Sequence, residues 1–176
     1  MKKVILIEDN SYWYEIFKGV FDQMKISYFP ETEDNFDILR SSFSPVLTQG
    51  EYIQPFQDER TEQVIKMLAD YIDGTKDQDI LCICDYQLFE NKPSVNGVNF
   101  YEKFLGDEKP VIFVSATTDR REIELIERFC SRKSNREFFR KDERIGCVLT
   151  NKEGSEREQA KFEKALAEKI KAFLEK

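Results

Sequence analysis

Short apolar runs that stop abruptly at a polar residue recur along the chain. The clearest is Val4 to Ile7, because it is rich in β-branched residues and is followed at once by Glu8 and Asp9. A continuous apolar run of this length is typical of a strand buried on both faces, as in a parallel sheet. Five such runs predict strands, at residues 4–7, 26–29, 79–84, 111–114 and 137–140.

Between these runs, apolar residues recur at helical spacing, which predicts amphipathic helices. Five helices are predicted. Ser11 caps the first, and the next two cover 61–73 and 97–105. The fourth opens with 119–122, and the fifth follows a capping box at 155–158. Strands that alternate with helices favour a parallel sheet covered on both faces. The prediction is an α/β fold, a flavodoxin-like, doubly wound sheet of five strands in the order 2-1-3-4-5.

Residues 30–60 follow neither pattern, so the chain is predicted to be one domain, 1–176, with an insertion after the second strand. The insertion is rich in aromatic residues (Phe36, Phe43, Tyr52 and Phe56) among acids and prolines. Disordered segments are poor in aromatic residues, so this one is expected to pack on something. Two interpretations stay open: packing on the edge of the sheet, or contact with a partner or a second copy, as in a homodimer.

Composition narrows the function classes. The net charge of −7 argues against direct binding to nucleic acid or to an anionic membrane. No apolar run has the length of about 20 residues that a membrane span needs, so we expect a cytoplasmic protein. The chain has no histidine, which excludes Ser-His-Asp and Cys-His catalysis. Its four cysteines, Cys82, Cys84, Cys130 and Cys147, are too few and too scattered for a disulfide scaffold, and Cys82 and Cys84 are interpreted as buried strand thiols.

The candidate chemistry lies where the strands stop. In the order 2-1-3-4-5 the first and third strands are neighbours, so Glu8, Asp9 and Asp85 should meet at the carboxyl edge of the sheet. Crowded carboxylates repel one another unless a cation lies among them, and Mg²⁺ prefers oxygen ligands. Ser115 and Lys141 end two further strands, on the far side of this group. A hydroxyl and an ammonium there would suit the oxygens of a phosphoryl group.

With these motifs, the sequence resembles the receiver domains of two-component response regulators. The matching stretches are residues 4–10, 80–88, 96–97, 110–116 and 138–141. The resemblance implies that Glu8 and Asp9 bind Mg²⁺, that Asp85 is the phosphoacceptor and metal ligand, and that the backbone carbonyl of Gln87 completes the metal site. It also implies a switch hydroxyl at Ser115, a phosphate-binding lysine at Lys141 and an aromatic switch at Phe138.

The resemblance further implies a function in signal transduction. A histidine kinase or a phosphotransfer protein would supply the phosphoryl group, and a downstream protein partner would read the result. The alternative is a receiver-like module that binds its partner without phosphorylation. A phosphohydrolase of the haloacid dehalogenase type would need a second aspartate two residues after its nucleophile, where this chain has Gln87. Enzymatic turnover beyond the protein's own phosphorylation and dephosphorylation is therefore not expected.

Overall fold

A five-stranded, all-parallel sheet forms the centre of the molecule, with strand order β2-β1-β5-β6-β7. The computed structural model describes residues 2–44, 46–48, 51–53, 56, 58–88, 95–141, 145 and 152–175, with only the backbone for 46–48, 51–53 and 152–155. Numbered along the sheet's own strands, this order is 2-1-3-4-5, so the predicted α/β, flavodoxin-like fold is confirmed. The strands are β1 (Lys3–Ile7), β2 (Tyr28–Phe29), β5 (Ile80–Asp85), β6 (Val111–Ser115) and β7 (Arg136–Arg140).

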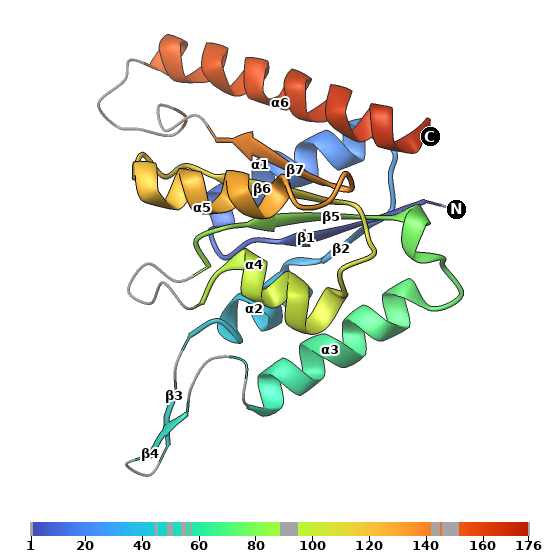
Figure 1. The fold of residues 1–176 in the computed structure, drawn as a ribbon, viewed down its shortest axis with the longest axis vertical. Coiled ribbons are helices and arrows are strands. Elements are labelled where there is room, and N and C mark those ends of the chain that lie inside the picture. Colours follow the sequence, from blue (N-terminus) through green and yellow to red (C-terminus); the bar gives the residue numbers. More distant parts are fainter. Residues whose placement is uncertain are drawn as a thin grey trace.

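Helices cover both faces of this sheet (Figure 1), which explains why the strands read as continuous apolar runs. All six residues of β5 are buried. One core lies between the sheet and α1 and α6, and a second core, on the opposite face, includes residues of α3, α4 and α5. The helices are α1 (Ser11–Met24), α2 (Glu33–Ser41), α3 (Glu59–Ile72), α4 (Gly97–Phe100, continued by a π-helical turn, Tyr101–Leu105), α5 (Arg120–Cys130) and α6 (Lys152–Leu174).

Two predicted helix starts need correction. Asn10, rather than Ser11, caps α1, because its side-chain oxygen accepts hydrogen bonds from the backbone N–H groups of Tyr12 and Trp13. The α6 helix begins at Lys152, so residues 155–158 lie inside the helix and do not form its capping box. The cap motifs in the sequence therefore located both helices, but each helix begins earlier than its motif predicted.

The insertion contains α2 and a separate hairpin of β3 (Val46–Thr48) and β4 (Glu51–Ile53), which projects away from the sheet (Figure 1). Phe36 is 2% exposed and stacks on Tyr14 of α1, with ring centroids 4.1 Å apart. Phe43 is 1% exposed and meets Phe100 of α4 edge to face. The partner-contact interpretation is thus wrong for Phe36 and Phe43, because both rings are buried within the domain.

Three cysteines, Cys82, Cys84 and Cys130, are free thiols in buried positions, as expected for Cys82 and Cys84. Cys147 lies outside the described residues. Burial raises the pKa of the Cys82 thiol to about 12, so this thiol stays protonated. Among the described residues, no helix combines the length and the apolar composition needed to cross a membrane.

Candidate functional site

Three carboxylates meet at the carboxyl edge of the sheet. Glu8 and Asp9 follow β1 directly, and Asp85 is the last residue of the neighbouring strand β5. One carboxylate oxygen from each residue lies within 4.8 Å of the others, which is close enough for all three to share one metal ion. The predicted convergence of Glu8, Asp9 and Asp85 is therefore present in the structure, and their all-oxygen donor set fits a hard divalent cation.

Lys141 lies among these carboxylates. Its Nζ is 2.7 Å from Glu8 Oε2 and 3.0 Å from Asp85 Oδ2, and its side chain is 2% exposed. The expected position of Lys141 on the far side of the cluster is therefore wrong. A buried ammonium needs anions as partners, and Glu8 and Asp85 provide them.

The charges of the cluster do not balance. With all acids ionised, Glu8, Asp9, Asp85 and Lys141 together carry a charge of −2 in a largely buried site. Burial, together with repulsion from Glu8, raises the pKa of Asp85 to about 7, although Lys141 opposes the shift. Burial and repulsion from Asp85 raise the pKa of Asp9 to about 6. A divalent cation would neutralise this excess charge, so the cluster suits such a cation electrostatically.

Burial also affects the pKa values of Glu8 and Lys141, the other two members of the cluster. It raises the pKa of Glu8, although Lys141 and a hydrogen bond from the Asn10 backbone N–H (3.1 Å) oppose the shift. For Lys141, burial favours the neutral amine, but attraction to Asp85 and Glu8 outweighs it and raises the pKa. Lys141 therefore stays charged, and any proton that relieves the cluster binds to a carboxylate.

Gly97 fixes the backbone behind Asp85. A Cβ atom at position 97 would lie 2.1 Å from the carbonyl oxygen of Asp85, far inside any real contact. The Gly97 backbone N–H also donates to the carbonyl of Tyr86 (3.0 Å). The start of α4 therefore approaches the end of β5 in a way that only glycine permits, and this contact positions the Asp85 carboxylate.

Ser115 and Gln87 are connected through Glu122 in the first turn of α5. Glu122 Oε2 accepts hydrogen bonds from Gln87 Nε2 (3.0 Å) and from the Thr117 hydroxyl (2.7 Å). The Thr117 backbone N–H in turn donates to the Ser115 hydroxyl oxygen (3.1 Å), and Ser115 is fully buried. These contacts tie the segments after β5 and β6 together. The sequence indicated Glu122 only as part of a helix start, since nothing in it marks a contact with Gln87.

Of two aromatic residues near this edge of the sheet, Trp13 contacts the cluster directly and Phe138 packs in the core. Trp13 is 8% exposed, and Lys141 Nζ lies 5.0 Å from its ring centroid, within cation–π range. Phe138 is half-buried on β7, opposite Phe113 of β6, and packs against the core that includes α4 and α5. Trp13 is therefore a direct neighbour of the candidate site.

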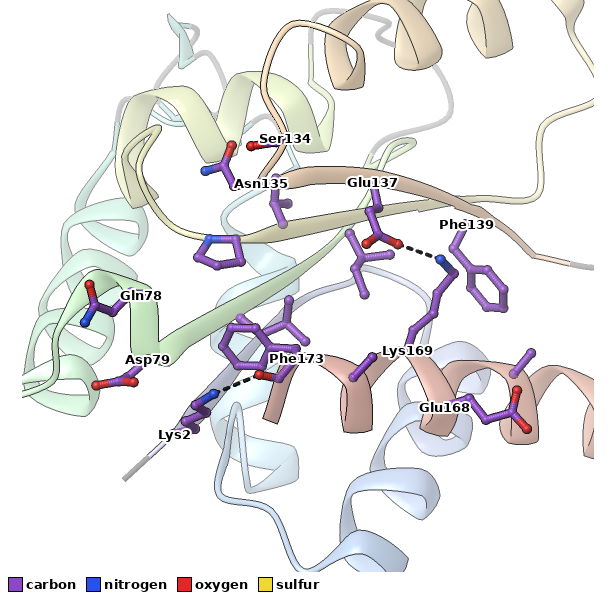
Figure 2. Close-up of a pocket in the computed structure, with 16 residues that line it drawn as sticks. Lys2, Gln78, Asp79, Ser134, Asn135, Glu137, Phe139, Glu168, Lys169 and Phe173 are labelled. Carbon is purple, nitrogen blue, oxygen red and sulfur yellow. Dashed lines mark hydrogen bonds and ion pairs between the residues drawn. The ribbon is translucent and has the colours of Figure 1, made fainter. Parts of the chain in front are cut away.

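A separate cavity of about 780 Å³ lies between α6 and the amino ends of β5, β6 and β7 (Figure 2). Lys2 Nζ donates to the carbonyl of Phe173 (2.8 Å) there, and Lys169 Nζ pairs with Glu137 (2.6 Å). None of the carboxylates of the cluster lines this cavity. It sits at the opposite end of the strands, so the chemistry of the carboxylates belongs to the other edge of the sheet.

No protein-family model matches the chain, and no curated protein or solved structure matches it.

Proposed function

We propose that the protein is a phospho-accepting response regulator receiver, which takes a phosphoryl group on Asp85 with Mg²⁺ held by Glu8, Asp9, Asp85 and the backbone carbonyl of Gln87. The observation that supports this best is the joint placement of three carboxylates and one lysine at adjacent strand ends. A structural ion pair needs one acid for each base. The surplus of two acids instead favours a site for a divalent cation and an electrophile.

The residues present can perform this chemistry. The Asp85 carboxylate would attack phosphorus, and the bond from phosphorus to the donor's leaving group would break, which leaves an aspartyl phosphate. When bound, Mg²⁺ would neutralise charge on the phosphoryl oxygens. Lys141 already contacts Asp85 and can follow the new phosphate, and the Ser115 hydroxyl can turn from Thr117 to donate to it. Phe138 on the neighbouring strand would then report the change to the surface.

A histidine kinase or a phosphotransfer protein is the proposed donor, in an exchange that would take place in the cytoplasm. We propose that a downstream partner protein binds the phosphorylated form and so passes on the signal. The alternative, a receiver-like module that binds its partner without phosphorylation, makes the opposite prediction for the experiment that follows.

Incubation with acetyl phosphate and Mg²⁺ is expected to add one phosphoryl group to the protein, on Asp85. Intact-mass spectrometry measures the addition, and borohydride reduction followed by peptide mapping locates it. Removal of Mg²⁺ with a chelator should prevent the reaction, because the carboxylates then repel the incoming phosphate. Protein that stays unlabelled in saturating Mg²⁺ would favour the phosphorylation-independent module instead.

Asp9→Ala is expected to weaken Mg²⁺ binding at least tenfold, which corresponds to about 1.4 kcal/mol. Asp9 is the least buried of the three carboxylates, so its loss removes a ligand with little effect on packing. Titration calorimetry or Trp13 fluorescence measures the affinity. Asp70→Ala, on the exposed face of α3, is the matched control and should bind Mg²⁺ like the wild type. Equal affinities for the two variants would remove Asp9 from the metal site.

A further inference from the structure

An exposed apolar residue lies beside two arginines near the end of α5. Leu125 is 57% exposed, more than any other large apolar residue in the described part of the chain. Arg128 lies three residues further on, on the same face of α5, and Arg132 lies just past the end of the helix; all three line one cavity. Both are exposed, and neither forms an ion pair with any residue that the structure describes. Arginine is enriched at protein interfaces, so this surface is a candidate contact surface.

A small cavity adjoins this face. It has a volume of about 230 Å³ and lies between α5 and the start of α4. Tyr86 and Val98 are half-buried in its wall, and Phe129 is 8% exposed there. The remaining lining residues are Asn96, Asn99, Leu125, Arg128 and Arg132. We call this cavity, together with the Leu125 face, the α4–α5 groove. It combines an apolar floor with a rim of two arginines.

The local charge is opposite to that of the molecule. The whole chain carries −7, whereas residues 120–133 contain five arginines and lysines against three glutamates. Some of these charges are already engaged: Glu122 accepts from Gln87 and Thr117, Glu124 pairs with Arg120 (2.9 Å), and Lys133 pairs with Asp107 and Glu108. Among the described residues, this leaves Arg121, Arg128 and Arg132 against Glu127. At physiological salt, charges more than about 8 Å away are largely screened. A ligand close to the groove would therefore be attracted by the charges of Arg128 and Arg132, and the net negative charge of the whole chain would have little effect on it.

We propose that the α4–α5 groove binds an acidic peptide segment of a partner protein, with one apolar side chain seated between Leu125, Val98 and Tyr86. Carboxylates of the peptide on either side of that anchor would pair with Arg128 and Arg132. Leu125 and Arg128 on one face of α5, with Arg132 just past its end, would contact successive parts of a segment laid along the groove. The apolar floor favours a peptide over a nucleic acid, because a phosphate backbone offers no apolar side chain to fill it.

Selection from a random peptide library tests this directly. Immobilised wild-type protein is the target, and the double variant Arg128→Glu/Arg132→Glu removes peptides that bind elsewhere. Enriched peptides should carry an apolar residue flanked by aspartate or glutamate. A labelled synthetic copy of the most enriched peptide, measured by fluorescence anisotropy, should bind at least tenfold more weakly to Arg128→Glu and to Leu125→Ala. Its affinity should also fall as salt is raised.

Lys171→Glu is the matched control, because it makes the same charge change at an exposed position on α6. It should bind the peptide like the wild type. Enrichment of neutral or basic peptides, no enrichment at all, or equal binding to Arg128→Glu would overturn the proposal. Self-association of the wild type that Arg128→Glu abolishes, seen by sedimentation, would assign the groove to a second copy and also overturn it. None of these measurements needs phosphorylation, so they are independent of the proposed function.

Discussion

Lys141→Met should lower the free energy of unfolding by about 3 kcal/mol in the presence of a chelator, because removal of one partner from a buried ion pair leaves its counterpart uncompensated. Here two carboxylates lose their cation at once, since Lys141 contacts both Glu8 and Asp85. Methionine retains most of the volume of lysine, so the loss reports charge rather than a cavity. Urea denaturation followed by Trp13 fluorescence measures the effect.

Two controls separate this effect from a general loss of lysine. Lys169→Met breaks the pair with Glu137, whose partners are 33% and 51% exposed, and should cost less than about 1 kcal/mol. Addition of Mg²⁺ should restore part of the stability of Lys141→Met, because a bound cation again compensates the carboxylates. If Lys141→Met is as stable as Lys169→Met, the buried cluster does not depend on its lysine.

Asp85→Asn should abolish phosphoryl uptake and at the same time stabilise the metal-free protein, by about 1–2 kcal/mol above the raised pKa of Asp85. The substitution removes one negative charge from a site with a surplus of two, and Lys141 keeps its contact with Glu8. At a chain length of 176 residues, each 1 kcal/mol raises the melting temperature by about 3 °C. Intact-mass spectrometry and thermal melts measure the two effects.

The stabilisation should depend on pH in a defined direction. Asp9 and Asp85 bind protons more tightly in the folded protein than in the unfolded chain, so their contribution to stability is present in acid. It is lost as the pH rises through about 6 and 7, which are the pKa values of Asp9 and Asp85. The advantage of Asp85→Asn should therefore shrink as the pH falls. Asp70→Asn, on the surface of α3, should match the wild type throughout. Labelling of Asp85→Asn at the wild-type level would disprove the assignment of the phosphoacceptor.

The sheet could be predicted because each of its central strands is marked by a local pattern in the sequence. Each of β1, β5 and β6 is a continuous apolar run closed by a polar residue, and the order of the strands follows from the alternation with helices. The α2 helix could not be predicted in the same way. It has only nine residues, and its buried residues divide between two cores: Phe36 packs with α1, and Leu39 packs on the other face. Phe36 and Leu39 are three residues apart and share one side of the helix, but two buried positions are too few to establish a helical period.

The candidate site also has features that the sequence predicts and features that it does not. The convergence of Glu8, Asp9 and Asp85 follows from strand order alone, because backbone topology brings the carboxyl ends of neighbouring strands together. The direct pairing of Lys141 with Glu8, and the hydrogen bond from Gln87 to Glu122, depend on the reach and rotamers of long side chains. Those details are set by the assembled structure and leave no periodic signal in the sequence.

The two edges of the sheet also determine how the protein behaves at high concentration. An edge strand with free N–H and C=O groups is a template on which another chain can add a strand. At one edge, β2 offers a template only two residues long before the chain turns away at Pro30. At the other edge, three of the five residues of β7 are charged: Arg136, Glu137 and Arg140. Short length at one edge and charge at the other disfavour strand addition, so fibrous aggregation through the sheet is opposed on both sides.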